Sequence, residues 1–476
     1  MLSTAGRPVC PYDTISSMKA VLVLALCAAA VATAQVQSAA PAGDPIIVST
    51  AHPRLFLRPA RLRLLRRERE RASLRWQQLE TLMAGGAAMP EPGFAGALYY
   101  QVAGDKTAGR KAIAWALGPD ADLRQMALVY DWCQDLFSDA ERQNFAARLS
   151  RRMTDSAADA SMAAARSRAL AAVALFDDFP DTPPRELERL IHQWWDGKIT
   201  PALKDGRHIV SRDDAYPLYE LLHAIQDNAK LDLRESNPRF FKDYPIEHLL
   251  SYYPAAYQAP ENDYFIGAES KPGEPDLRLA ALSRAAELAI VAYDANAPET
   301  QVLQGWLMHD KYLMRSAFGT PYEFLWANPY QPGLSYYHVP LVYYAPEFGR
   351  LFIRSNWEDS AEWFGHFDGV MQSFDNGRVT LIDPQHPPAQ LELTEAVICF
   401  GKTTGKFEVN LEDAQPVFIV GLEPKRMYQV EVDDEEMAEF VADSTGILEL
   451  DDVPSGKPVG VRIVVGQASR PVPPGL

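Results

Sequence analysis

The hydrophobic pattern of this chain changes its period near residue 320, and that change most narrows the folds open to it. From His52 to about Phe318, apolar residues recur at spacings of three and four, as in residues 126–132 (MALVYDW). After residue 345 they alternate, as in residues 350–354 (RLFIR). A period near 3.6 predicts amphipathic helices, and a period of two predicts half-buried strands. The chain is therefore expected to be an α+β multidomain protein whose helices precede its strands.

The helical half carries clear start and stop signals. Gly118-Pro119 and Phe179-Pro180 interrupt the pattern, and Ser138 with Glu141 predicts a capping box before a helix that ends near Arg152. Helical hairpins in series favour a bundle, a solenoid or an α/α toroid.

The strand half also carries a turn signal. Asp375-Asn376-Gly377 predicts a tight turn between two strands. The pattern predicts a helical domain over residues 51–320, a strand domain over 321–400, for which a resemblance given below implies a β-sandwich, and a further β module over 401–476.

The first 34 residues resemble a secretory signal peptide. A 15-residue apolar run, Ala20–Ala34, follows Lys19 and ends in Ala32-Thr33-Ala34. Because Met18 stands where such a signal starts, residues 1–17 are interpreted as an upstream extension. The run is short of the about 20 residues that a membrane span needs, so a membrane anchor is the less favoured alternative. Residues 35–50 are expected to be a linker, and the mature protein to be secreted or periplasmic and not membrane-bound.

Composition excludes several functions. The 476 residues hold 46 Lys and Arg against 63 Asp and Glu, a net charge of −17, which argues against nucleic-acid binding. Of four cysteines, only Cys133 and Cys399 lie beyond residue 34, and they fall in different predicted domains, so no disulfide framework is expected. No spacing typical of a metal or nucleotide site is present, and no metal or cofactor is predicted.

An arginine-rich segment, residues 54–75, holds nine arginines and two glutamates. It could bind a polyanion, or it could be an amphipathic helix whose charged face meets solvent. The second interpretation is favoured, because charge runs usually solvate a helix face.

A tyrosine pair follows an arginine in residues 211–219 (SRDDAYPLY). Tyr216 and Tyr219 are three apart, which places them on one face of a helix, and Arg212 precedes them. A phenol beside a cation can act as an acid or a base. Two packed tyrosines with hydrated hydroxyls are the alternative.

Two other groups of side chains could carry chemistry. His366 and Asp368 are two apart in a predicted strand, where the carboxylate could orient the imidazole, the pair could bind a metal, or the contact could be structural. Asp131 and Asp135 are four apart on a predicted helix, and they could serve glycoside chemistry or simply face water.

Several motifs together resemble the heparinase II/III-like group of polysaccharide lyases. They are HPRLF at residues 52–56, LFIRSNW at 351–357, the DAYPLY of 214–219 and the HFD of 366–368 with Ser373-Phe374. The resemblance implies an incomplete α/α toroid followed by an antiparallel β-sandwich. It also implies β-elimination on an acidic, uronic-acid-containing polysaccharide. On that basis Tyr216 or Tyr219 would be the acid and base, His366 the partner base or neutraliser, and Arg212 the group that holds the carboxylate.

The sequence departs from the group in one place. The group usually carries an Asn in a toroid helix before the tyrosine motif, and residues 155–165 contain neither Asn nor His. The neutraliser of the uronate carboxylate is therefore unassigned. A non-catalytic glycan-binding or surface scaffold protein on the same fold stays an alternative. An inverting glycoside hydrolase is another, and it would need two carboxylates roughly 6.5–9.5 Å apart.

Overall fold

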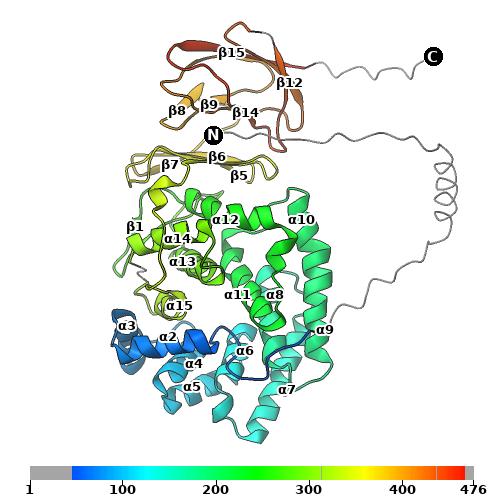
Figure 1. The fold of residues 1–476 in the computed structure, drawn as a ribbon, viewed down its shortest axis with the longest axis vertical. Coiled ribbons are helices and arrows are strands. Elements are labelled where there is room, and N and C mark those ends of the chain that lie inside the picture. The colour runs from blue at the N-terminus through cyan, green and yellow to red at the C-terminus, as the bar shows by residue number, and fades with distance from the viewer. Residues whose placement is uncertain (1–45, 312–313, 436, 467–476) are drawn as a thin grey trace, which may run out of the picture. The chain divides into compact units, whose positions relative to one another are not determined.

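The computed structural model describes residues 46–311, 314–435 and 437–466 (Figure 1). The predicted signal peptide and most of the predicted linker lie outside these residues. Within the described residues, no helix is both long and apolar enough to cross a membrane. Residues from Ile46 onward belong to one compact unit by their mutual contacts.

The first part of the chain is helical. Its helices are α2 (Pro59–Glu70), α3 (Leu74–Ala84), α4 (Pro92–Ala103), α5 (Lys106–Ala116), α6 (Leu123–Trp132), α7 (Asp139–Asp155), α8 (Met162–Ala174), α9 (Thr182–Glu188), the π-helical η2 (Arg189–Ile199), α10 (Thr200–Lys204), α11 (Arg212–Ala229), α12 (Pro238–Leu250), α13 (Leu277–Tyr293), α14 (Pro298–His309) and α15 (Gly319–Trp326), with short 3₁₀ turns at η1 (Gln134–Leu136), η3 (Leu233–Ser236) and η4 (Tyr336–His338).

Six of these helices form a closed circuit of contacts. In the order α4, α6, α8, α11, α13 and α15, each helix contacts the next, and α15 returns to contact α4 (Figure 1). Such a circuit is the arrangement of an α/α toroid, and the predicted helical first half is confirmed.

Local capping explains where two key helices begin. Ser138 Oγ accepts from the Glu141 backbone N–H at 3.4 Å, and the Glu141 carboxylate accepts from Ser138 N–H at 2.8 Å, as the sequence predicted. Ser211 and Asp214 make the same box at the start of α11. The second box fixes Arg212 in the first turn of α11.

The arginines of α2 bind the ends of other helices. Arg66 and Arg69 donate to the carbonyls of Gln101 and Val102 at the end of α4. Arg61 donates to the Leu325 carbonyl at the end of α15 at 3.0 Å. Terminal helix carbonyls lack partners within their own helix and carry partial negative charge. The arginine-rich segment therefore joins the first helix of the circuit to the last.

The described residues form four sheets, of which the first lies between α12 and α13 and the other three follow the helices. A two-stranded ribbon, β1 (Tyr257–Gln258) and β2 (Asp263–Tyr264), comes first. The sheets then run β3-β4-β5-β6-β7, β14-β11-β9-β8 and β10-β15-β12-β13. Their strands are β3 (Val342–Ala345), β4 (Arg350–Arg354), β5 (Trp363–Phe367), β6 (Val370–Asp375), β7 (Arg378–Leu381), β8 (Gln390–Leu393), β9 (Ala396–Phe400), β10 (Gly405–Asn410), β11 (Val417–Val420), β12 (Met427–Val432), β13 (Ala438–Val441), β14 (Leu448–Leu450) and β15 (Pro458–Val465).

The sheets are antiparallel except for the parallel pair β9 and β11. The predicted turn is present, with Asn376 and Gly377 at φ values of 47° and 76° between β6 and β7. The strand β9 ends at Phe400 and pairs with β11, which begins at Val417. One sheet therefore contains residues on both sides of position 400, where the sequence pattern placed a domain boundary.

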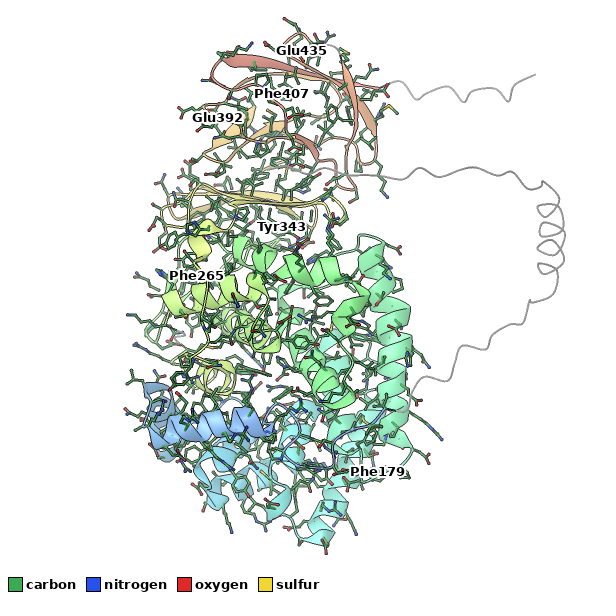
Figure 2. All side chains as sticks on the ribbon, viewed as in Figure 1. Phe179, Phe265, Tyr343, Glu392, Phe407 and Glu435 are labelled. Carbon is green, nitrogen blue, oxygen red and sulfur yellow. The ribbon has the colours of Figure 1, made fainter. Side chains whose placement is uncertain are left out.

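The sheet β3–β7 has one face toward the helices and one toward the second sheet. Phe352 and Trp363 join the helical core, whereas Leu351 and Phe364 join a core shared with β8, β9 and β11. Side chains fill the region between this sheet and the helices, where Tyr343 is labelled (Figure 2). Trp363 Nε1 donates to the Leu250 carbonyl at 2.8 Å and fixes α12 against the sheet.

Candidate active site

A cavity of about 660 Å³ opens where α11 and α12 meet the sheet β3–β7. Its walls come from the start of α11, one face of α12, the segment 268–276 and the ends of β4 and β5. The lining residues are His208, Val210, Ser211, Arg212, Asp213, Tyr244, Glu247, His248, Ser251, Ala268, Glu269, Ser270, Lys271, Asp276, Leu279, Arg350, Phe367 and Asp368.

One face of α12 supplies the buried wall of this cavity. Tyr244, Glu247 and His248 follow the spacing of one helical face, and Ser251 caps the same face one turn later. All four side chains are buried. Polar groups on a buried helix face must be paired or must meet a ligand.

Glu247 is the ionised centre of that wall. Its carboxylate lies 3.0 Å from His208 Nε2 and 2.7 Å from Arg350 Nε, and it accepts from the Tyr343 hydroxyl at 3.2 Å. Burial alone would raise the pKa of Glu247, but the charges of His208 and Arg350 outweigh it and lower the pKa to about 2. The carboxylate therefore holds the His208 ring by Nε2 and leaves Nδ1 for a ligand.

Tyr244 is the available phenol of the cavity. Its hydroxyl makes no hydrogen bond to any residue that the structure describes. Burial raises the pKa of Tyr244, while the positive charges of Arg212 and Arg350 act in the opposite direction. The side chain is thus a neutral proton donor at neutral pH.

Arg350 and Arg212 bring positive charge to the cavity in different ways. Arg350 pairs through Nε with Glu247 and through Nη1 with Asp368 at 3.0 Å, and its Nη2 bonds to no described residue. Arg212 donates to the His248 carbonyl at 3.1 Å and to Ser251 Oγ, and its guanidinium lies over the Tyr252 ring at 4.4 Å. Arg350 can therefore bind a ligand directly, whereas Arg212 is held in the wall.

Gly267 makes room for the Arg212 side chain. A Cβ atom at this position would lie 2.0 Å from Arg212 Nε. Only glycine allows the backbone to approach the guanidinium this closely.

His248 belongs to the cavity wall and to a buried polar group around Glu287. Its Nε2 is 3.3 Å from Arg212 Nη1 and 3.4 Å from Glu287 Oε1, and the Tyr252 hydroxyl donates to the same Glu287 at 2.6 Å. Burial and then the Arg212 charge lower the pKa of His248. A neutral His248 supports Arg212 without adding charge.

The opposite rim of the cavity is acidic. Asp213, Glu269 and Asp276 line it together. Burial, and after it the neighbouring carboxylates, raises the pKa of Asp213 and of Glu269. The cavity is thus polarised, with its basic side on α12 and β4.

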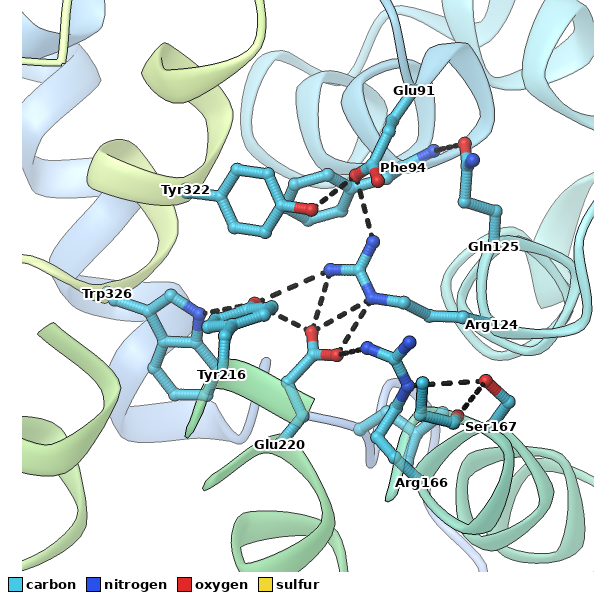
Figure 3. Close-up of polar contacts among 12 residues, drawn as sticks. Glu91, Phe94, Arg124, Gln125, Arg166, Ser167, Tyr216, Glu220, Tyr322 and Trp326 are labelled. Atoms are coloured by element: carbon cyan, nitrogen blue, oxygen red, sulfur yellow. Dashed lines mark hydrogen bonds and ion pairs between the residues drawn. The ribbon is translucent and has the colours of Figure 1, made fainter. Parts of the chain in front are cut away.

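Of the four site residues predicted from sequence, Arg212 lines this cavity. Tyr216 lies instead in a buried network within the helices (Figure 3). Its hydroxyl donates to Glu220 at 2.6 Å and accepts from Trp326 Nε1 at 3.0 Å. Burial, followed by the Glu220 charge, raises the pKa of Tyr216. Its hydroxyl is committed to structural hydrogen bonds.

Tyr219 and His366 are also buried away from the cavity lining. Tyr219 stacks on Tyr244 with ring centroids 6.3 Å apart and does not itself line the cavity. His366 Nδ1 lies 3.2 Å from the Gly349 carbonyl, and burial chiefly lowers its pKa. The structure joins neither tyrosine of the predicted motif to His366. Asp368 pairs with Arg350 rather than with His366.

The acidic pair considered for glycoside chemistry does not share one helix, because Asp131 lies in α6, which ends at Trp132, and Asp135 lies in the turn η1. Asp131 is buried and accepts from the backbone N–H groups of Arg54 and Leu55 at 3.0 and 2.8 Å. It also pairs with His52 at 2.6 Å. Asp131 therefore anchors the HPRLF segment to α6.

The sequence contains a signal for α12 that lies outside the motifs named above. Tyr244, Glu247 and His248 share a face with the apolar Phe240 and Phe241 side of the helix, where an unpaired charge would be costly. No local pattern marks His208 or Arg350, because their role comes from contacts with Glu247.

No cluster of three or more His, Cys, Asp or Glu side chains among the described residues could hold a metal ion. The residues of the cavity that could bind an anionic group directly are Arg350 and the exposed Lys271.

Comparisons with known proteins leave the family open. No protein family and no curated protein matches the sequence. One solved structure, titled "Glycoside hydrolase", is similar to 82% of this chain and 72% of its own, with 12% identity and a TM-score of 0.32. So distant a likeness carries no argument, and the resemblance to the heparinase II/III-like group rests on the motifs alone.

Proposed function

We propose that this protein is an exported, carbohydrate-active enzyme that cleaves a uronic-acid-containing polysaccharide by β-elimination. One observation carries the proposal. The hydroxyl of Tyr244, which bonds to no described residue, shares a cavity with the His208 imidazole, held by a carboxylate, and with the guanidinium of Arg350.

The reaction sets three requirements. The uronate carboxylate must be neutralised so that the proton on the neighbouring carbon becomes acidic, a base must remove that proton, and an acid must protonate the leaving glycosidic oxygen. Arg350 Nη2, with Lys271 at the rim, supplies positive charge for the carboxylate. Arg212 adds charge from the wall.

His208 is assigned as the base. The Glu247 carboxylate lies 3.0 Å from its Nε2 and orients the ring, so Nδ1 accepts the proton from the sugar carbon. The electrons of that C–H bond form a double bond to the next ring carbon, and the bond from that carbon to the glycosidic oxygen breaks.

Tyr244 is assigned as the acid. Because its pKa is raised, the phenol holds its proton at neutral pH and gives it to the departing oxygen. The products are an unsaturated uronate end and a sugar with a free hydroxyl, and solvent exchange restores His208 and Tyr244.

The test uses the purified protein and a panel of uronate polymers, followed by the ultraviolet absorbance of the unsaturated product. Tyr244→Phe and His208→Ala should each lower kcat by roughly a hundredfold or more. Tyr219→Phe is the matched control, because this buried tyrosine touches Tyr244 but does not line the cavity. Absence of unsaturated product from every polymer, or full activity in Tyr244→Phe, would refute the proposal.

A second function is favoured by a specific observation. Asp213 and Glu269 have raised pKa values on the cavity rim, as a carboxylic acid that protonates a glycosidic oxygen requires. A glycoside hydrolase would release reducing sugar without ultraviolet absorbance, and Glu269→Gln would abolish that release.

A further inference from the structure

A hollow of about 210 Å³ adjoins the acidic rim of the cavity. It lies between the segment that follows α12, the segment 266–275 and the turn between β6 and β7. Glu269 lines both the hollow and the cavity, so the two spaces share a wall.

The shared wall is firmly held. Gln372 of β6 donates from Nε2 to the Glu269 carbonyl at 2.6 Å and accepts from the Tyr253 hydroxyl at 2.8 Å. Ala268 N–H donates to the Ser251 carbonyl at 2.8 Å. The hollow is therefore a preformed extension of the cavity rather than a gap beside a loose loop.

Apolar and aromatic side chains line most of the hollow. Tyr253 stacks on Phe374 with centroids 5.9 Å apart, Val379 completes the floor, and the exposed fraction of Tyr257 is 41%. Sugar rings present C–H faces that pack on such aromatic surfaces, while their hydroxyls bond to polar groups at the edge.

The charge of the hollow selects among sugars. Its lining contains Glu269 and Glu274 but no Lys or Arg, whereas Arg212, Lys271 and Arg350 line the adjoining cavity. A second uronate or a sulfated sugar in the hollow would face two carboxylates, and no Lys or Arg in the lining would pair with it directly.

From this difference in charge between the hollow and the cavity we infer that the hollow binds the sugar next to the cleaved uronate, and that this sugar is uncharged. The substrate is then a heteropolysaccharide in which uronate alternates with a neutral sugar, and not a homopolymer of uronate. This inference rests on the proposed function for the identity of the cavity's ligand.

The experiment compares alternating polymers, hyaluronan and unsulfated chondroitin, with two uronate homopolymers, polygalacturonate and alginate. Both the rate of product formation and the retardation of the protein in polymer-containing gels are measured. The alternating polymers should give at least about tenfold higher kcat/KM.

Variants test the hollow itself. Tyr257→Ala should raise KM for alternating polymers roughly three- to tenfold with kcat unchanged, because it removes binding common to the ground and transition states. Glu274→Lys should reduce the ratio of kcat/KM for the alternating polymers to kcat/KM for the homopolymers. Tyr337→Ala, at a tyrosine with a 51% exposed fraction outside the hollow, should change neither value.

The outcomes separate the two proposals. Equal or better cleavage of the homopolymers, or a Tyr257→Ala variant indistinguishable from Tyr337→Ala, overturns the inference and leaves the lyase intact. If no polymer yields unsaturated product, the lyase proposal fails. Gel retardation then tests whether the hollow binds sugar. Weaker retardation of Tyr257→Ala than of the wild type by alternating polymers supports binding in the hollow, and unchanged retardation overturns it.

Discussion

The buried network around Glu220 makes a sharp prediction about stability. Glu220 accepts from Arg124 Nε at 2.8 Å and Nη2 at 2.7 Å, from the Tyr216 hydroxyl at 2.6 Å, and from Arg166 (Figure 3). These residues come from α6, α8 and α11, three consecutive members of the helix circuit. Glu220→Gln keeps the shape of the side chain and removes its charge.

The expected cost follows from what the substitution leaves behind. Removing one partner of a buried ion pair typically costs about 3–5 kcal/mol, because the remaining charge stays buried. Arg124 would retain Glu91, whose carboxylate lies 2.9 Å from Nη1. The lower end, about 3 kcal/mol of the free energy of unfolding, is therefore expected. The matched control is Asp181→Asn, which breaks an exposed pair with Arg185 and should cost less than about 1 kcal/mol.

The effect should also depend on pH in one direction. Burial pushes the pKa of Glu220 up, but Arg124 and Arg166 outweigh it, so the folded pKa lies below its ordinary value. The stabilisation is then fully present above the unfolded pKa of about 4.3 and is lost as the pH falls through the folded pKa.

Urea unfolding followed by helical circular dichroism at pH 7 and near pH 4 measures both effects. Glu220→Gln should unfold at lower urea than the wild type at pH 7, and the difference should shrink in acid. A difference below about 1 kcal/mol at pH 7, or one that does not shrink, would show that the network does not hold the circuit together.

Three further predictions concern other contacts. Gly267→Ala should displace Arg212, because the added Cβ would lie 2.0 Å from its Nε, and should lower the rate of elimination roughly tenfold or more; an unchanged rate would contradict the place of Arg212 in the cavity. Burial raises the pKa of Glu323 to about 7, so the stability that its protonated form contributes is fully present below the unfolded pKa of about 4.3 and is lost as the pH rises to about 7. Relative to the wild type, Glu323→Gln should gain roughly 3 kcal/mol of unfolding free energy between about pH 3 and about pH 8, and a constant difference would refute this. Trp363→Phe removes the hydrogen bond to the Leu250 carbonyl and should cost about 1–2 kcal/mol in thermal or urea unfolding, whereas no loss would mean that the sheet does not depend on this contact.

Local features of the fold could be predicted from the sequence. The capping box of Ser138 and Glu141 and the turn at Asn376 depend on residues within a few positions of each other, and both are present. The change of hydrophobic period placed the helices before the strands for the same reason.

The site depended on contacts that no local pattern encodes. Tyr216 and Tyr244 both occur in helices next to a proline and acidic residues, so the sequence could not rank them. The fold distinguishes the two as candidate catalytic residues. Tyr216 bonds to Arg124, 92 residues away in the sequence, within a buried network, whereas Tyr244 lines a cavity. His208 and Arg350 belong to the site because both contact Glu247, and the sequence does not show these contacts.

The arginines of α2 have a consequence for synthesis of the chain. Arg61 and its carbonyl partner at Leu325 are 264 positions apart. At about 5–20 residues per second, a ribosome needs roughly 13–50 seconds to add that length. Until residue 325 has been added, Arg61 lacks its Leu325 partner, whereas Arg66 and Arg69 can already bind the end of α4. The circuit of helices can therefore close only after α15 has been synthesised.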